Sequence, residues 1–206
     1  LAYLVGAFLT DGWATKKQIG ICVNDRDFAE NFARCVQSAI GVTCPIHQRK
    51  SPKSRMGFMW RFAIRSRELE NWLRSETENK AKVPDDIMGA KDEIALSFLA
   101  GAMDGDGIMG HSIRKGTGKS QFSVGFCGAR LGFVAQVTSL MKRFGAVPTK
   151  SVFNKQRPTN QTMIQRFANI SIAHSPFNFG IRRKQARLEL LRQMYLPQRP
   201  YVGTVE

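Results

Sequence analysis

LVGAFLTDG at residues 4–12 and LAGAMDGDG at residues 99–107 are two versions of one nine-residue pattern. A constant offset of 95 residues relates the copies, so that Gly6 matches Gly101 and Asp11 matches Asp106. Each copy ends an apolar run at an Asp-Gly pair, which predicts a short buried helix that stops there. A single Asp-Gly pair is most often a simple turn. Two copies at a long fixed period instead indicate two similar folding units, each presenting one acidic residue at the same place.

Small residues recur at every fourth position of both runs, and spacing of four places side chains on one helical face. The two stripes are Ala2, Gly6 and Thr10 in the first copy, and Ser97, Gly101 and Gly105 in the second. Such stripes let two helix backbones approach closely, so we predict a helix interface formed by Ala2, Gly6, Ser97 and Gly101. That packing would bring Asp11 and Asp106 together, where two carboxylates repel each other unless a cation lies between them. Hard oxygen ligands suit Mg²⁺, and metal-bound carboxylates can support phosphodiester hydrolysis.

Composition narrows the class of partner. The chain has 206 residues, of which 43% are hydrophobic, and a net charge of +15 from 31 Lys+Arg against 16 Asp+Glu. This excess is typical of proteins that bind nucleic acid or an anionic membrane. No apolar stretch reaches the roughly 18 residues of a membrane span, which leaves nucleic acid as the expected partner. The four cysteines form no Cys-x-x-Cys pair, so we expect reduced thiols in an intracellular protein.

The pattern between and after the two copies predicts the same order of elements twice: helix, two strands, helix, two strands, helix. In the first half we expect strands at 18–24, 45–50 and 58–65, a helix ending near Ile40, and a helix that Ser66 caps. In the second half we expect strands at 108–115, 121–126, 149–154 and 163–172, and helices at 131–144 and 181–194. The domains are then 1–80 and 93–206, joined by a polar linker at 81–92.

The two halves differ in the number of residues between the acidic residue and the end of the next helix. Ile40 follows Asp11 by 29 residues, whereas Phe144 follows Asp106 by 38. The nine extra residues fall in the first hairpin of the second half, around residues 114–119. We therefore expect the two halves to contact a partner differently.

Four strands per half with helices on one face leave the other face open, and basic and polar side chains occupy the predicted outward and loop positions. Lys and Arg neutralise phosphates, while Arg, Gln and Asn can also contact base edges in the major groove. The predicted DNA-binding residues are Lys17, Gln18, Asn24, His47, Arg49, Lys50, Lys53, Arg55, Arg61, Arg65, Arg114, Lys115, Lys119, Gln121, Ser123, Lys150, Asn154 and Arg166.

The second nine-residue copy closely resembles the LAGLIDADG signature. The first resembles it more loosely, with Leu9 where an acid is common. Over nearly its whole length the chain is similar to the single-chain, two-repeat LAGLIDADG homing endonucleases, or meganucleases. The resemblance implies an α+β fold of two pseudo-symmetric αββαββα units. Each unit would have a four-stranded, antiparallel, saddle-like sheet, and the two signature helices would pack together.

The same resemblance implies a monomeric enzyme that cleaves both strands of a long, asymmetric DNA target. Asp11 and Asp106 would be the catalytic acids, and with the carbonyls of Thr10 and Gly105 they would bind two or three divalent cations, Mg²⁺ above all. Family members often have a basic residue near the cleaved phosphates, for which Arg67 is the candidate, with His174 or Ser175 at the equivalent place in the second half. Asp25 and Ala129 stand where the family often has a polar residue that organises water.

Two alternative functions remain. An RNA maturase that binds its own intron RNA, or a DNA-binding regulator, would use the same fold without cleavage. A structural basic protein of a ribonucleoprotein would fit the charge but leaves the duplicated Asp-Gly helices unexplained. Loss of either acid would favour the non-cleaving readings, and both acids are present.

Overall fold

A computed structural model describes residues 1–52, 54, 56–157 and 160–196 of the chain, with the side chains of 153–161 left out. The first half contains α1 (Ala2–Thr10), β1 (Gly12–Thr15), β2 (Gln18–Val23), α2 (Arg26–Ile40), β3 (His47–Lys50), β4 (Phe58–Arg65) and α3 (Arg67–Glu76). A short helix, α4 (Asp85–Met88), connects it to the second half. The second half contains α5 (Asp92–Gly105), β5 (Gly107–Ile113), β6 (Ser120–Gly128), α6 (Leu131–Arg143), β7 (Pro148–Arg157), β8 (Asn160–Phe167), α7 (Asn169–His174) and α8 (Arg182–Tyr195).

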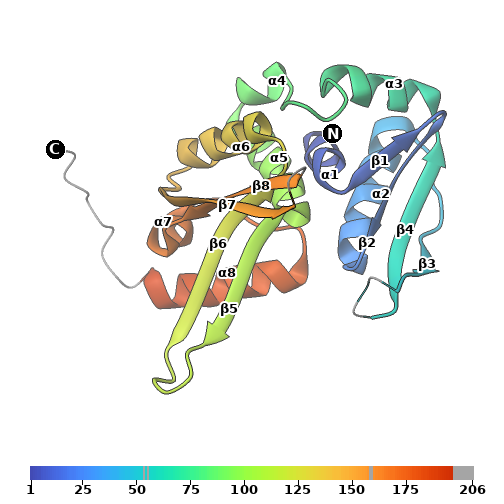
Figure 1. Cartoon of the computed structure of the whole chain (residues 1–206). Coiled ribbons are helices and arrows are strands. Elements are labelled where there is room, and N and C mark those ends of the chain that lie inside the picture. The colour runs from blue at the N-terminus through green and yellow to red at the C-terminus, as the bar shows by residue number, and fades with distance from the viewer. Residues whose placement is uncertain (53, 55, 158–159, 197–206) are drawn as a thin grey trace.

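The strands form two separate four-stranded antiparallel sheets of matching topology, β1-β2-β4-β3 and β5-β6-β8-β7. The two sheets lie on either side of the α1 and α5 helices (Figure 1). The glycine after each acid starts the first strand of its sheet, with Gly12 opposite Ile21 and Gly107 opposite Phe126. The α+β fold of two αββαββα units predicted from the sequence is therefore confirmed.

Alternation along each strand separates a buried face from an open face. Ile19 and Ile21 of β2, and Phe122 and Val124 of β6, point into the core beneath the helices and are at most 6% exposed. The residues between them face the opposite side of the sheet, because successive strand side chains point to opposite faces. Each half therefore keeps one open sheet face.

Helices α1 and α5 meet through glycine. A Cβ added to Gly6 would lie 2.3 Å from the carbonyl oxygen of Phe98, and one added to Gly101 would lie 2.1 Å from that of Tyr3. Only glycine permits so close an approach of two backbones. The close crossing explains how the C-terminal ends of both helices reach one place.

Three details differ from the sequence-based expectation. The strand expected at 163–172 ends at Phe167, and α7 begins at Asn169. Phe167 and Ile170 could not share one face of a strand, and the change from strand to helix removes that conflict. The polar linker contains the short helix α4, and the edge strand β1 follows Asp11 directly although its four residues show no clear alternation. None of the described helices has the length and hydropathy needed to cross a membrane.

Candidate active site

Asp11 and Asp106 occupy matching places at the C-terminal ends of α1 and α5, and each backbone N–H closes the last helical turn. They lie close together. A Cβ on Gly105, the neighbour of Asp106, would be 3.1 Å from the Oδ2 atom of Asp11. By residue, Asp11 is exposed and Asp106 is half-buried.

Their environment disfavours the charged forms. Displacement of water by the surrounding protein, followed by the charge of Asp11, raises the pKa of Asp106 to about 6. Loss of hydration also raises the pKa of Asp11, against the opposing effect of Lys184 and then Lys80. Helix C-termini carry partial negative charge, which adds to the cost of placing carboxylates there. A divalent cation would relieve this repulsion, so the residues present fit one.

The pair would supply only part of a metal coordination shell. Among the described residues, no three or more His, Cys, Asp or Glu side chains gather around a possible cation site. Mg²⁺ commonly uses one or two carboxylates and completes its shell with waters and substrate phosphates. Two carboxylates that face an open surface match that kind of site.

Two lysines cap the helix ends that carry the acids. The Nζ atom of Lys80 donates hydrogen bonds to the carbonyl oxygens of Thr10 and Gly12, both at 2.9 Å. The Nζ atom of Lys184, which is only 5% exposed, donates to those of Met103 at 2.7 Å and Gly105 at 3.2 Å. The carbonyls of Thr10 and Gly105, expected as metal ligands, thus already bind an ammonium group, although a carbonyl oxygen has a second lone pair.

Desolvation lowers the pKa of both lysines to about 8. Of the two ammonium groups, Lys184 has the larger effect on the pKa of Asp11, and Lys80 has the larger effect on that of Asp106. Both ammonium groups therefore act on both acids.

Arg67, the basic residue expected from the sequence, does not join this group. It starts α3 just beyond Arg65, which pairs with Gln18 at the hairpin end of the sheet. Asp11 lies at the other end, next to the Gly12 and Ile21 pair. The chain folds back along the sheet through α3, and this brings Lys80 to the place near Asp11 where a basic residue was expected.

The second half departs from expectation in the same way. His174 ends α7 as an exposed residue, and Ser175 is buried and donates no bond to either acid. The sequence did contain a signal for both lysines. Lys80 follows Ile40 by 40 residues and Lys184 follows Phe144 by 40 residues, so the two match once the nine-residue hairpin extension is removed.

A polar cavity of about 310 Å³ opens beside Asp11, and its lining includes Asp25, Arg183 and Lys184. Asp25 stands at the N-terminus of α2, but its carboxylate forms an ion pair with Arg183 at 2.9 Å instead of capping the helix. This bridge joins the two halves at the rim of the candidate site.

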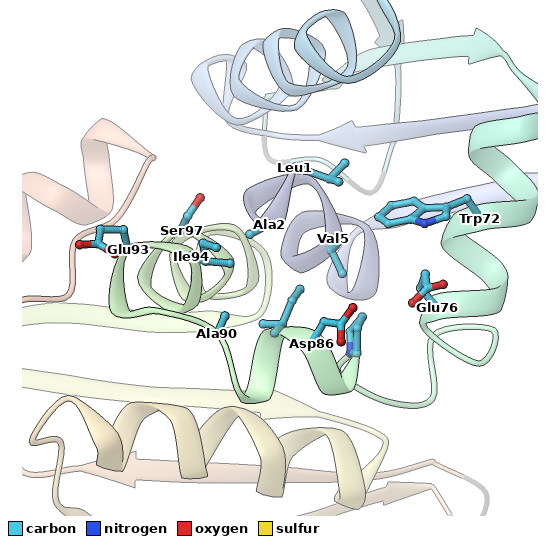
Figure 2. A pocket seen from close by; sticks show the side chains of 12 residues that line it. Leu1, Ala2, Val5, Trp72, Glu76, Asp86, Ala90, Glu93, Ile94 and Ser97 are labelled. Carbon is cyan, nitrogen blue, oxygen red and sulfur yellow. The ribbon is translucent and has the colours of Figure 1, made fainter.

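A second cavity, of about 550 Å³, lies at the other end of the helix pair, next to Ala2 and Ser97 (Figure 2). Its lining is mostly apolar, with Val5 and Trp72 on one side and the carboxylates of Glu76, Asp86 and Glu93 around it. An acidic rim does not suit a polyanion, so this cavity is not a candidate nucleic-acid site.

The open face of the first sheet carries the expected basic residues. His47 lies opposite Arg61 on neighbouring strands, and Arg49 shares their face. The guanidinium of Arg61 stacks over Trp13, 5.2 Å from the ring centroid. Trp13 is an aromatic residue of this face that sequence reasoning missed. Lys50, by contrast, lies opposite Phe58, on the helix side of the sheet.

The other expected contact residues are distributed over both halves. Asn24 accepts a hydrogen bond from Ser54 at 2.8 Å, and Arg166 donates to Ser123 on the open face of the second sheet. The exposed positions are Lys17, Arg65, Arg114, Lys115, Lys119, Gln121 and Lys150, while Gln18 is half-buried. Lys53, Arg55 and the side chain of Asn154 lie outside the described residues.

Comparison with known proteins agrees with this geometry. The model of the LAGLIDADG-like domain matches residues 1–78. The family resemblance stated from the sequence is thereby confirmed for the half whose signature is the looser of the two. No curated protein matches the chain in sequence.

Solved structures extend the likeness from the LAGLIDADG-like domain to both halves. I-DmoI, bound to its target DNA nicked in the coding strand in the presence of manganese, is 12% identical with a TM-score of 0.54, covering 86% of this chain and 96% of that one. The LAGLIDADG homing endonuclease I-GzeII, in complex with a DNA target, is 10% identical with a TM-score of 0.54, covering 98% and 92%. The meganuclease I-SmaMI, bound to uncleaved DNA with calcium ions, is 12% identical with a TM-score of 0.53, covering 95% and 92%. At these identities the likeness establishes the two-repeat fold.

Proposed function

We propose that this chain is a site-specific endonuclease that hydrolyses phosphodiester bonds of double-stranded DNA with divalent cations held at Asp11 and Asp106. The observation that carries the proposal is the pair of carboxylates with raised pKa, flanked by the half-buried Lys80 and the buried Lys184, between two open sheet faces. A binding protein without chemistry has no need of this costly arrangement. The proposal also agrees with the DNA complexes of I-DmoI and I-GzeII.

The residues would divide the work as follows. Asp11 and Asp106 would hold the cations, whose chemistry would be to activate water and to stabilise the leaving oxygen. Lys80 and Lys184 would place positive charge beside the scissile phosphate, which becomes more negative in the transition state. Preorganised charge of this kind raises the rate of the chemical step by about 10²–10³. Arg61, His47 and Arg166 would hold the duplex through phosphate and base-edge contacts.

The DNA target is asymmetric because the first β-hairpins of the two halves differ in length. Strands β5 and β6 have 7 and 9 residues, against 4 and 6 for β1 and β2. The β5–β6 hairpin extends well beyond the rest of its sheet (Figure 1). The chain acts as a monomer with repeats at 1–80 and 93–206, because one chain provides both acids and both lysines.

The test is cleavage of a randomised duplex library with Mg²⁺, Mn²⁺, Ca²⁺ or EDTA. We expect one discrete cleavage site with Mg²⁺ or Mn²⁺ and none with EDTA. If the wild type leaves every duplex intact with each cation but binds an intron RNA or one DNA sequence tightly, the maturase or regulator reading replaces the proposal.

On the recovered target, Lys80→Met and Lys184→Met should each reduce the single-turnover rate by about 10²–10³. Lys91→Met is the matched control, since Lys91 is exposed at the opposite end of α5. Normal cleavage by both lysine variants would remove these residues from the mechanism.

A further inference from the structure

Asp104 is a carboxylate that the proposed chemistry does not use. It lies two residues before Asp106 and is 2% exposed, yet it is fully engaged in hydrogen bonds. Its Oδ2 atom accepts from the Tyr3 hydroxyl at 2.6 Å, and its Oδ1 atom accepts from the backbone N–H groups of Gly180 at 3.0 Å and Ile181 at 3.1 Å. A buried carboxylate is retained at a cost that only such bonds offset.

These contacts form a closed polar cluster of Asp104, Tyr3, Asn31 and Gly180. Asn31 donates to the carbonyl oxygen of Gly180 at 3.1 Å and to the Tyr3 hydroxyl at 3.3 Å. A Cβ on Gly180 would lie 2.4 Å from Oδ2 of Asp104 and 2.8 Å from Nδ2 of Asn31. The cluster therefore joins α1 and α2 of the first half to α5 and the start of α8, with no room for another side chain at Gly180.

The cluster fixes the helix that carries Lys184. Ile181 is the N-cap of α8, and Lys184 lies in its first turn. The Asp104 side chain binds the backbone at this helix start, where a negative charge is favourable. Its own carbonyl oxygen accepts from the Lys184 ammonium at 2.5 Å. Asp104 therefore contacts this segment twice, through its side chain at the start of α8 and through its carbonyl oxygen at the Lys184 ammonium group.

The first half has no equivalent. Leu9 occupies the place that corresponds to Asp104. Lys80 instead follows two turn residues with positive φ, and its backbone N–H donates to the Thr77 hydroxyl at 3.0 Å. Disturbing the cluster should therefore displace one lysine and leave the other in place.

We infer that Asp104 and Tyr3 are positioning residues for Lys184 alone, so that the cluster sets the cleavage rate of one DNA strand. This inference rests on the proposed endonuclease function. A displacement of about 1 Å at a reacting centre can cost 10²-fold in rate. Weakening the cluster should accordingly turn the enzyme into one that nicks a single strand.

The experiment measures single-turnover cleavage of each strand of the recovered target, labelled separately. Lys184→Met first identifies the strand that depends on Lys184. We expect Asp104→Asn and Tyr3→Phe to slow that strand at least about 10-fold more than the other, with unchanged affinity for uncleaved DNA in Ca²⁺. Thr138→Val, which removes a hydrogen bond to Val134 within α6, is the control for a general loss of stability.

A second measurement needs no cleavage. Amide hydrogen exchange at residues 180–185 should accelerate in Tyr3→Phe and Asp104→Asn, and stay at the wild-type rate in Thr138→Val. Equal slowing of both strands, or unchanged exchange at 180–185, would overturn the inference while leaving the endonuclease proposal intact. Absence of cleavage by the wild type would instead defeat the proposed function, and the exchange result would still decide whether Asp104 fixes the start of α8.

Discussion

Asp106→Asn should abolish DNA cleavage and at the same time stabilise the metal-free protein at neutral pH. The amide keeps the shape of the carboxylate but loses the charge that would hold a cation, so no cleavage should be detected. The stability gain follows from the raised pKa of Asp106, about 6 against 3.8 for the free group. The folded state then binds the proton more tightly than the unfolded state, and stability falls as pH rises from about 4 to 6. At pH 7 the ionised carboxylate costs about 3 kcal/mol, which asparagine removes.

Thermal unfolding at two pH values checks this prediction. The melting temperature of Asp106→Asn should exceed that of the wild type at pH 7, by about 6–12 °C for about 3 kcal/mol in a chain of this size. The difference should shrink at pH 4.5, where Asp106 is protonated in the folded wild type. Glu93→Gln, a change of an exposed carboxylate at the far end of α5, should alter neither cleavage nor melting. An equal gain at both pH values would show that the charge of Asp106 is not the cause.

Addition of a divalent cation should make the wild type more stable than Asp106→Asn. Mg²⁺ or Mn²⁺ binds the folded wild type and raises its melting temperature by mass action. Asp106→Asn and Asp11→Asn should respond much less, because each keeps only one carboxylate. A cation-induced rise of the same size in all three proteins would place the binding site elsewhere.

The paired helices and their acids could be predicted from the sequence because all the information is local. Each signature run carries its own small-residue stripe and its own Asp-Gly stop, and the constant offset links the two. Strand β4 was likewise predicted to the residue, since Phe58–Arg65 alternates clearly.

The lysines were harder to predict because their position depends on distant backbone. Lys80 reaches the end of α1 only after α3 has folded back along the sheet, and Lys184 depends on a cluster formed by residues from both halves. Arg67 was the nearest basic residue in sequence after β4, but the strand carries it away from Asp11. From the sequence, Asp104 could be recognised only as part of the signature. Its hydrogen-bond partners Tyr3 and Gly180 could not be predicted, because they lie about 75 to 100 positions away in the chain.

Gly101→Ala should destabilise the fold strongly. The new Cβ would lie 2.1 Å from the carbonyl oxygen of Tyr3 and 2.9 Å from the backbone nitrogen of Ala7. Both atoms belong to the α1 backbone, so no side chain can rotate away. The helices would have to separate, and overpacking of this kind costs about 3 kcal/mol or more. Separation would also move Asp106 away from Asp11, so cleavage should be lost even under conditions where the variant remains folded.

Gly132→Ala adds the same methyl group at a position where it should increase the stability of the fold. Gly132 lies in the first turn of α6, and a Cβ there would meet no atom within 4 Å. Alanine favours a helix over glycine by up to about 1 kcal/mol, so this variant should gain stability and cleave normally. Urea unfolding of both variants measures the contrast, with Gly6→Ala expected to follow Gly101→Ala because its Cβ would lie 2.3 Å from the carbonyl oxygen of Phe98. If Gly101→Ala unfolds at the same urea concentration as Gly132→Ala, the two signature helices are not held at the close separation on which the pairing of Asp11 with Asp106 depends.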